Sequence, residues 1–346
     1  MEENPYGLNV ERTTLSTVYG PVPSWRFGRS LGIDIIQPPK TCSFNCVYCQ
    51  LGRTQTGLSS PEEFKDYVRA NDVERDLERY LEDLDMESID VVTFSGGGEP
   101  TLNPEMGEIL DRVRHLTAGK VPIVLLTNSS LLHRNYVRRT VAGFDIVVAK
   151  LDAGEEGAFR TINRPIASAP NIETIIESIK KLRKETKGTL MTQTMFLNTD
   201  FGFTNCDGRA LDSLFRATVA IEPDVIQIDT PYRPGGESFV KRVSIDRLKS
   251  IGKRFEEYIE SVNAPSELWV FGVHDKRGRK AAWKEHASIQ EAIVGLLKRR
   301  PCRVVDIADS LGISYKEALG NIYDLLEDCR VVKQIASNEE EYYRPR

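Results

Sequence analysis

The sequence has few histidines, little cysteine outside one short stretch and no long apolar runs, and each shortage excludes a class of protein. Its strongly apolar runs, such as Val121–Leu126, fall far short of the ~20 residues that a membrane-spanning helix needs. The acidic amino-terminus, Met-Glu-Glu-Asn-Pro, lacks an apolar segment, so we expect no secretory signal. We therefore expect a cytoplasmic protein with no membrane partner.

Positive charge is not in excess, because 46 Lys and Arg residues face 51 Asp and Glu residues, for a net charge of −5. This balance argues against a protein coated in positive charge for nucleic acid, although it allows a local basic patch. Six cysteines are too few for a disulfide-stapled scaffold in a chain of 346 residues. Three of them lie within residues 42–49, which in a reduced compartment predicts a metal site.

Short runs rich in Val, Ile and Thr alternate with longer amphipathic segments through most of the chain. Such runs are typical of buried parallel strands, and their spacing suits strand–helix units. We predict an α/β fold with a partial (β/α)6, TIM-like barrel over residues 31–272, after an N-terminal extension over residues 1–30. The predicted strands begin near Leu31, Ile89, Val121, Phe144, Leu190 and Asp224.

The pattern changes after residues 273–284, which we interpret as a basic linker. An apolar stripe from Ile289 to Leu297, a short helix over Val305–Leu311 and a third helix over about Tyr315–Leu326 follow. The alternating segment Arg330–Tyr343 is typical of a hairpin. This order predicts a winged helix-turn-helix domain over residues 285–346.

Cys42, Cys46 and Cys49 form a C-x3-C-x2-C pattern. Thiolates on one short loop can surround a cuboidal iron–sulfur cluster, and three ligands for a four-iron cluster leave one iron free to bind a small molecule. Structural zinc usually takes four Cys or His ligands, and the nearest histidine in the sequence is His115. A zinc site, and a cluster with Cys206 as fourth ligand, stay as alternatives to the favoured [4Fe-4S] cluster with an open iron.

With Tyr48 before the last cysteine, and with the cysteine loop after the predicted strand Leu31–Ile36, the chain resembles the radical S-adenosylmethionine (SAM) superfamily. The resemblance implies that the open iron binds SAM and that the reduced cluster cleaves SAM to methionine and a 5′-deoxyadenosyl radical. The radical would then abstract hydrogen from a substrate. The implied cofactors are a [4Fe-4S] cluster and SAM, with a reductant such as ferredoxin or flavodoxin, and the cluster is expected to be oxygen-sensitive.

Glycines and polar side chains end the predicted strands, where α/β barrels carry their sites. The segment Ser95–Pro100 resembles the superfamily's GGE motif, which binds the SAM amine. Lys150 and Asp152 face the same side by the two-residue period of a strand, and would reach the SAM carboxylate and ribose. The predicted cofactor-binding residues are Tyr48, Gly97, Gly98, Glu99, Asn128, Lys150, Asp152 and Gln193, with Gln227 and Asp229 as further inward candidates.

Two segments, residues 19–32 and 151–165, are similar to a prokaryotic, largely archaeal, group of radical SAM proteins related to the wyosine (tRNA-guanine) synthases. Those synthases carry additional upstream cysteines for a second cluster, whereas no cysteine precedes Cys42 here. We interpret Cys206, Cys302 and Cys329 as small buried hydrophobes.

We predict a radical SAM enzyme whose substrate is a peptide or protein in preference to RNA, because the acidic balance disfavours polyanions. RNA (tRNA) modification and a SAM- or redox-sensing winged-helix regulator remain alternatives. The face of the predicted recognition helix is acidic toward its end, so we expect no specific DNA binding and propose that the winged helix docks a substrate. Basic residues over 275–303 form either a solvated linker or a landing strip for tRNA or an acidic partner, and Arg233 is a candidate substrate anchor.

Overall fold

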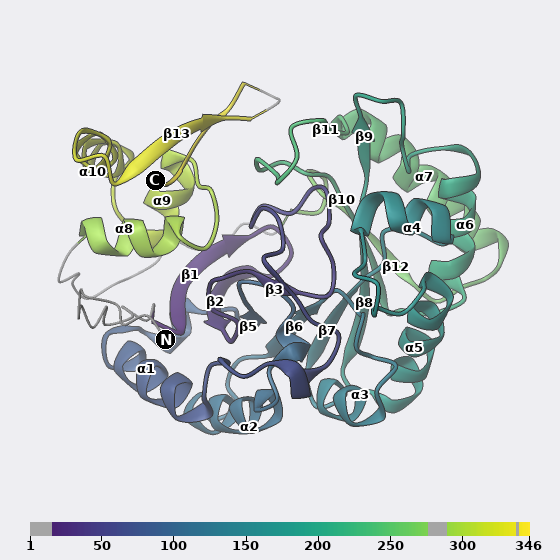
Figure 1. The fold of residues 1–346 in the computed structure, drawn as a ribbon, viewed down its shortest axis with the longest axis horizontal. Helices are drawn as coiled ribbons and strands as arrows, with labels where there is room; N and C mark the ends of the chain where they lie inside the picture. Colours follow the sequence, from purple (N-terminus) through teal and green to yellow (C-terminus); the bar gives the residue numbers. More distant parts are fainter. Residues whose placement is uncertain (1–15, 276–288, 337–338) are drawn as a thin grey trace, which may run out of the picture.

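A computed structural model describes residues 16–275, 289–336 and 339–346. Its centre is an eight-stranded sheet in the order β1-β2-β5-β6-β7-β8-β10-β12 (Figure 1). Strands β2 to β12 of this sheet pair in parallel, and β1 pairs antiparallel with β2. The strands are β1 Val18–Ser24, β2 Gly28–Asp34, β5 Val91–Ser95, β6 Ile123–Thr127, β7 Ile146–Lys150, β8 Thr189–Met195, β10 Val225–Asp229 and β12 Glu267–Val270.

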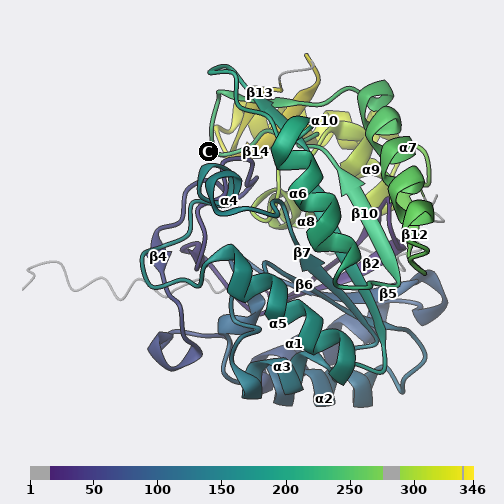
Figure 2. The same cartoon turned by 90° about the vertical axis from the view of Figure 1, so that its right-hand side faces the viewer.

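Helices cover the outer, convex face of this curved sheet, and Figure 2 shows α5, α6 and α7 in front of the strands that they cover. Alternate residues of each strand serve two cores, since Val92 and Phe94 pack toward the helices while Val91 joins an apolar layer inside the curve. The strands therefore look like continuous apolar runs in the sequence. The helices are α1 Ala70–Asp83, α2 Met106–Leu116, α3 Asn135–Val141, α4 Glu156–Asn163, α5 Ile172–Glu185, α6 Gly208–Val219 and α7 Ile245–Ser261.

The six predicted strands are all present, and the mostly parallel sheet agrees with a radical SAM partial barrel. Two features differ from the prediction. A further parallel strand, β12, extends the sheet beyond β10, and the predicted boundary at residue 30 falls inside β2. Strand β1 escaped the prediction because it contains Pro21 and Pro23, which a sheet tolerates at its edge.

The carboxyl-terminal residues form a compact unit against β1 (Figure 1). Its apolar core includes Ile293, Ile307 and Ile322, and Val22 of β1 belongs to the same cluster. The predicted order of three helices and a hairpin is present, while residues 276–284 of the predicted linker lie outside the described residues. The elements are α8 Ile289–Leu297, α9 Val304–Leu311, α10 Tyr315–Glu327 and the antiparallel strands β13 Val331–Ile335 and β14 Glu341–Pro345.

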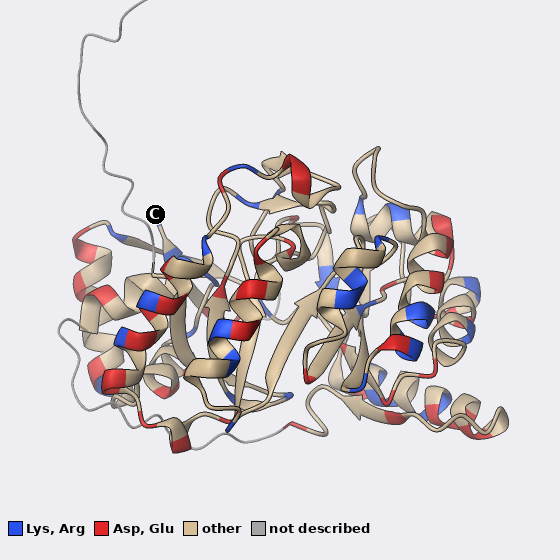
Figure 3. Cartoon of the chain, turned by 90° about the horizontal axis from the view of Figure 1, so that it is seen from below, with Lys and Arg blue, Asp and Glu red and all other residues tan. Residues whose placement is uncertain are grey.

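Charge is mixed over the outer helices. Figure 3 shows Lys and Arg interspersed with Asp and Glu along the helices seen from below, which agrees with the small net charge. Within the three described ranges, no helix has the length and apolar character needed to cross a membrane.

Candidate active site

The loop that carries the three cysteines follows β2 and is held by backbone hydrogen bonds to the last residues of α4. Asn45 N donates to the Asn163 carbonyl at 3.0 Å, and Val47 N donates to the Ile162 carbonyl at 2.9 Å. Cys42 itself lies in β3 (Thr41–Cys42), which pairs with β4 (Thr56–Gly57). Two segments distant in the sequence thereby fix the course of the loop.

Amide groups point at two of the cysteine sulfurs. Asn128 Nδ2 lies 3.4 Å from Cys42 Sγ, and Asn163 Nδ2 lies 3.4 Å from Cys46 Sγ. Burial, then the neighbouring Cys46 and Glu99, raises the pKa of Cys42, and burial with Asp152 and Cys49 raises the pKa of Cys46 to about 11. The thiols therefore need a positively charged metal centre to become thiolates, so cluster assembly would release protons.

The donor set fits an iron–sulfur cluster better than a single metal ion. Hydrogen bonds to cysteine sulfur are a regular feature of cluster sites, and two of the three sulfurs here lie within reach of an amide group. Across the part of the chain that the structure describes, no three His, Cys, Asp or Glu side chains are close enough to share one metal ion. Structural zinc usually takes four Cys or His ligands, and the described residues do not bring such a set together. The thiol of Cys206, which is the fourth ligand in the alternative cluster, donates to the Leu197 carbonyl at 3.6 Å.

The glycine motif after β5 packs directly against the cysteine loop. Glu99 N donates to the Thr41 carbonyl and Thr41 N donates to the Gly97 carbonyl, both at 3.0 Å. A Cβ added at Gly98 would lie only 1.6 Å from the Thr41 carbonyl oxygen. Glycine is therefore required at this position by the close approach of the two backbones.

Glu99 is buried and its carboxylate is fully occupied by the ends of two strands. One oxygen accepts from the Thr101 and Thr127 hydroxyls, each at 2.6 Å, and the other accepts from Asn128 N at 2.7 Å. Burial raises the pKa of Glu99, and these donors oppose that rise. The Glu99 side chain therefore connects the ends of β5 and β6 and sets the position of Asn128, while its predicted contact with SAM stays a prediction.

Tyr48, Asp152 and Lys150 lie together at the end of β7, as the sequence predicted. Asp152 accepts from the Tyr48 hydroxyl at 2.5 Å, from Asn163 Nδ2 at 2.7 Å and from Met195 N at 2.8 Å. Lys150 Nζ lies 4.7 Å from the centre of the Tyr48 ring and keeps 21% of its side-chain surface exposed. Lys150 Nζ also lies 3.9 Å from Asp152 Oδ1, at the long end of an ion pair, so the exposed part of its ammonium group is what could meet a ligand.

The inward-facing polar residues of β8 and β10 interact with one another. Gln193 Nε2 donates to Asp229 at 3.3 Å, and Asp229 accepts from Trp25 Nε1 at 3.2 Å. Burial raises the pKa of Asp229, and Arg26 opposes that rise. Gln227 is fully buried and its amide lies 3.1 Å from Met191 Sδ, so it serves the interior of the barrel.

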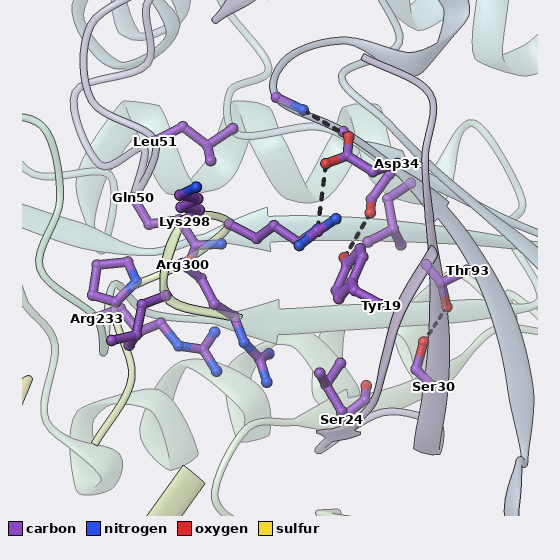
Figure 4. A pocket seen from close by; sticks show the side chains of 18 of the residues that line it. Tyr19, Ser24, Ser30, Asp34, Gln50, Leu51, Thr93, Arg233, Lys298 and Arg300 are labelled. Atoms are coloured by element: carbon purple, nitrogen blue, oxygen red, sulfur yellow. Dashed lines mark hydrogen bonds and ion pairs between the residues drawn. The ribbon is translucent and has the colours of Figure 1, made fainter. Parts of the chain in front are cut away.

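A cavity of about 710 Å³ occupies the curve of the sheet, where Ser30 of β2, Thr93 of β5 and Leu126 of β6 line it. Gly96 and Gly97 line one side of it, residues of the cysteine loop such as Gln50 and Leu51 line another, and Lys298 and Arg300 of the C-terminal unit close it (Figure 4). The cavity, called the lumen below, therefore lies between the glycine motif and the C-terminal unit.

Several site residues were missed by the sequence reasoning. Asn163 contacts both Cys46 Sγ and the Asp152 carboxylate through its side-chain amide. Asp34 accepts a hydrogen bond from Gly97 N at 3.2 Å. The only local signal for Asn163 is its place in the Ile162–Pro165 segment, where Arg164 has a positive φ of 46°. One prediction was wrong, because Cys329 is exposed at the end of α10, where φ is 56°, although Cys206 and Cys302 are buried.

This chain is similar to known proteins in sequence and in fold. The sequence profile of the Radical SAM superfamily matches residues 36–200. A protein of Brachyspira hyodysenteriae named GTPase Obg is 31% identical over 332 residues, which cover 94% of this chain but only 45% of that protein. A UPF0026 protein of Methanocaldococcus jannaschii is 34% identical over 300 residues, or 87% of each chain. Streptococcus suis SuiB, solved with its precursor peptide SuiA, shares the fold with a TM-score of 0.52 at 16% identity, over 69% of this chain and 48% of SuiB.

Proposed function

Since this chain belongs to the UPF0026 family and to the radical SAM superfamily, we propose that it carries its [4Fe-4S] cluster on Cys42, Cys46 and Cys49 and binds SAM across the neighbouring strand ends. It is an enzyme of that superfamily, with SAM and a [4Fe-4S] cluster as cofactors. When bound, the reduced cluster and SAM together supply a carbon-centred radical that can remove a hydrogen atom from a substrate. The observation that carries the proposal is the lumen, which reaches both the glycine motif and the cysteine loop.

The protein's own residues divide the work of binding SAM. The ammonium group of Lys150, held over the Tyr48 ring, would bind the carboxylate of SAM. Carbonyl groups of the Gly97–Gly98 segment would accept from its amine. Asp152 and Glu99 would act indirectly on SAM, because their oxygens accept hydrogen bonds that hold Tyr48 and Asn128 in place. Gln193 faces the same interior and would contact the adenosine or the substrate.

Two substrate classes remain proposals. A peptide or protein is favoured by the acidic balance of the whole chain, and RNA by the resemblance to the wyosine group. The lining of the lumen is positively charged, because Arg26, Arg233 and Arg300 line it, whereas the net charge of the whole chain is negative. This observation favours an anionic substrate.

The C-terminal unit, proposed as a winged helix over residues 285–346, would close the active site. Its residues Leu297–Pro301 line the lumen, and the Tyr342 hydroxyl donates to the Tyr232 carbonyl at 2.8 Å. The exposed face of α10 carries Glu317, Asp324 and Glu327, which suits neither DNA phosphates nor a DNA-binding regulator. A cytoplasmic location and a ferredoxin or flavodoxin as reductant complete the proposal.

The experiment is anaerobic reconstitution with iron and sulfide, reduction with dithionite, and measurement of 5′-deoxyadenosine released from SAM. We expect the wild type and Cys329→Ser, the matched control at an exposed cysteine, to release it at similar rates. We expect Cys46→Ala to bind less iron and release none. Release by Cys46→Ala at the wild-type rate would refute the assignment of the cluster ligands.

A further inference from the structure

The lumen is lined by positive charge on almost every side. Asp34 is the only acidic residue among the described residues that line it. Two of the basic residues are committed to internal partners, since Lys40 Nζ donates to the Gly52 carbonyl at 2.7 Å and Arg299 pairs with Asp34. The basic residues that line the lumen are Arg26, Lys40, Arg233, Lys298, Arg299, Arg300 and Arg344.

Among the arginines of this set that form no ion pair with any described residue, three also have buried nitrogens: Arg26, Arg233 and Arg300. They come from the turn between β1 and β2, the loop after β10 and the loop after α8. Figure 4 shows Arg233 and Arg300 extending into the same cavity. Buried nitrogens of all three lack a hydrogen-bond partner: Nε and Nη1 of Arg26, Nε of Arg233, and Nε and Nη2 of Arg300.

The neighbouring carboxylates are already engaged with other partners. Asp229, whose charge acts on Arg26, accepts from Trp25, Gln193 and its own neighbour Thr230 N. Asp306, whose charge acts on Arg233, is paired with Arg303 at 3.0 Å. Neighbouring guanidinium groups repel one another, as the lowering effect of Arg233 on the pKa of Arg26 shows, so an anionic ligand would be stabilised in this part of the lumen.

We propose that Arg26, Arg233 and Arg300 bind a phosphate group of the substrate. The inference rests on the proposed function, because the same cavity reaches the glycine motif at Gly96 and Gly97. A phosphate group carries close to two negative charges and three acceptor oxygens, which matches three guanidinium groups from three directions. A single carboxylate has one charge and two oxygens and would leave part of the set unpaired.

The site is held in shape before the ligand arrives. The Arg233 guanidinium lies 4.6 Å from the centre of the Tyr232 ring, and its Nη1 donates to the Tyr232 hydroxyl at 2.8 Å. Tyr232 in turn stacks on Phe271 with ring centres 4.8 Å apart, and Trp25 contacts Phe271 edge-on at 5.7 Å. These contacts hold the Arg233 side chain and the turn that bears Arg26. Binding therefore requires little further ordering of side chains, which lowers its entropic cost.

The test is calorimetric titration of the reconstituted full chain with inorganic phosphate and, in a parallel arm, with acetate. We expect phosphate to bind and acetate to bind much more weakly. Arg233→Gln and Arg300→Gln should each weaken phosphate binding by roughly tenfold or more, because each removes charge-assisted hydrogen bonds. Arg233→Lys should restore part of the affinity, since it keeps the charge without the planar fork.

The control is Arg242→Gln, because Arg242 is exposed on β11 (Val240–Arg242), outside the lumen, and its loss should leave binding unchanged. Further arms with adenosine 5′-monophosphate and O-phosphoserine distinguish a nucleotide from a phosphorylated amino acid as the source of the phosphate. Absence of phosphate binding, equal binding of acetate, or binding that survives both glutamine variants overturns the inference.

Failure of this inference is distinguishable from failure of the proposed function. SAM cleavage without phosphate binding would remove only the anion site. Phosphate binding that depends on the arginines, in a protein that releases no 5′-deoxyadenosine, would keep the anion site and remove the proposed chemistry.

Discussion

Arg299 and Asp34 form a buried ion pair that connects the C-terminal unit to the end of β2. Arg299 Nε and Asp34 Oδ2 are 3.6 Å apart, and only 8% and 6% of the two side chains are exposed. Asp34 also accepts a hydrogen bond from Gly97 N, so the pair reaches the glycine motif. Burial raises the pKa of Asp34 from 3.8 to about 6, and the charge of Arg299 limits that rise.

The direction of this shift predicts how the cost of removing Arg299 depends on pH. A pKa of about 6 in place of 3.8 corresponds to about 3 kcal/mol of unfolding free energy, at roughly 1.36 kcal/mol per pH unit. Because the folded-state pKa is the higher one, this stability is present below pH 3.8 and is lost as the pH rises through about 6. In Arg299→Met the pKa of Asp34 rises further, so the loss at alkaline pH grows. We expect a cost of ~3 kcal/mol near pH 8, at the lower end of the range for breaking a buried pair, and a clearly smaller cost near pH 5.5.

The assay is urea unfolding of the full chain at both pH values, followed by tryptophan fluorescence. The double variant Asp34→Asn, Arg299→Met is the control, because it lacks the titrating carboxyl and its stability relative to Asp34→Asn should not depend on pH. An equal loss for Arg299→Met at both pH values would refute the reasoning, as would a pH-dependent loss that persists in the double variant.

Two further substitutions test the site. Gly98→Ala should remove most of the reconstituted cluster, measured as iron and sulfide per chain, because its Cβ would collide with the Thr41 carbonyl. The control is Gly157→Ala in α4, where a Cβ meets nothing within 4 Å. This variant should keep the cluster and change stability by at most about 1 kcal/mol. A full cluster in Gly98→Ala would contradict the packing described. Glu99→Gln should lower the free energy of unfolding by about 1–3 kcal/mol, because its amide would face the Thr127 hydroxyl and other donors; an unchanged urea midpoint would show that these bonds do not stabilise the fold.

Local patterns were sufficient for the features that depend on nearby residues. Apolar runs predicted the six strands, and the helical stripes predicted the three helices of the C-terminal unit. The cysteine spacing and the polar strand ends predicted which residues meet, since Tyr48, Asp152 and Lys150 do lie together.

Features that depend on tertiary contact were beyond the sequence. The basic residues over 275–303 looked like a surface strip, but Arg299 and Arg300 point inward, because the C-terminal unit packs on β1 and closes the lumen. The net charge of −5 likewise gave no hint of a cationic lumen, since acidic residues such as those of α1 lie on the outside of the sheet and not in its curve. Glu99 was expected to contact SAM because the motif contains it, and its hydrogen bonds across two strands have no local signature.

The most direct test of the account is the electron paramagnetic resonance spectrum of the reduced, reconstituted protein with and without SAM. The account predicts the signal of a reduced [4Fe-4S] cluster that changes on addition of SAM, because one iron lacks a cysteine ligand and the glycine motif lies against the cysteine loop. A cluster signal that SAM leaves unchanged would contradict the placement of SAM beside Cys42, Cys46 and Cys49.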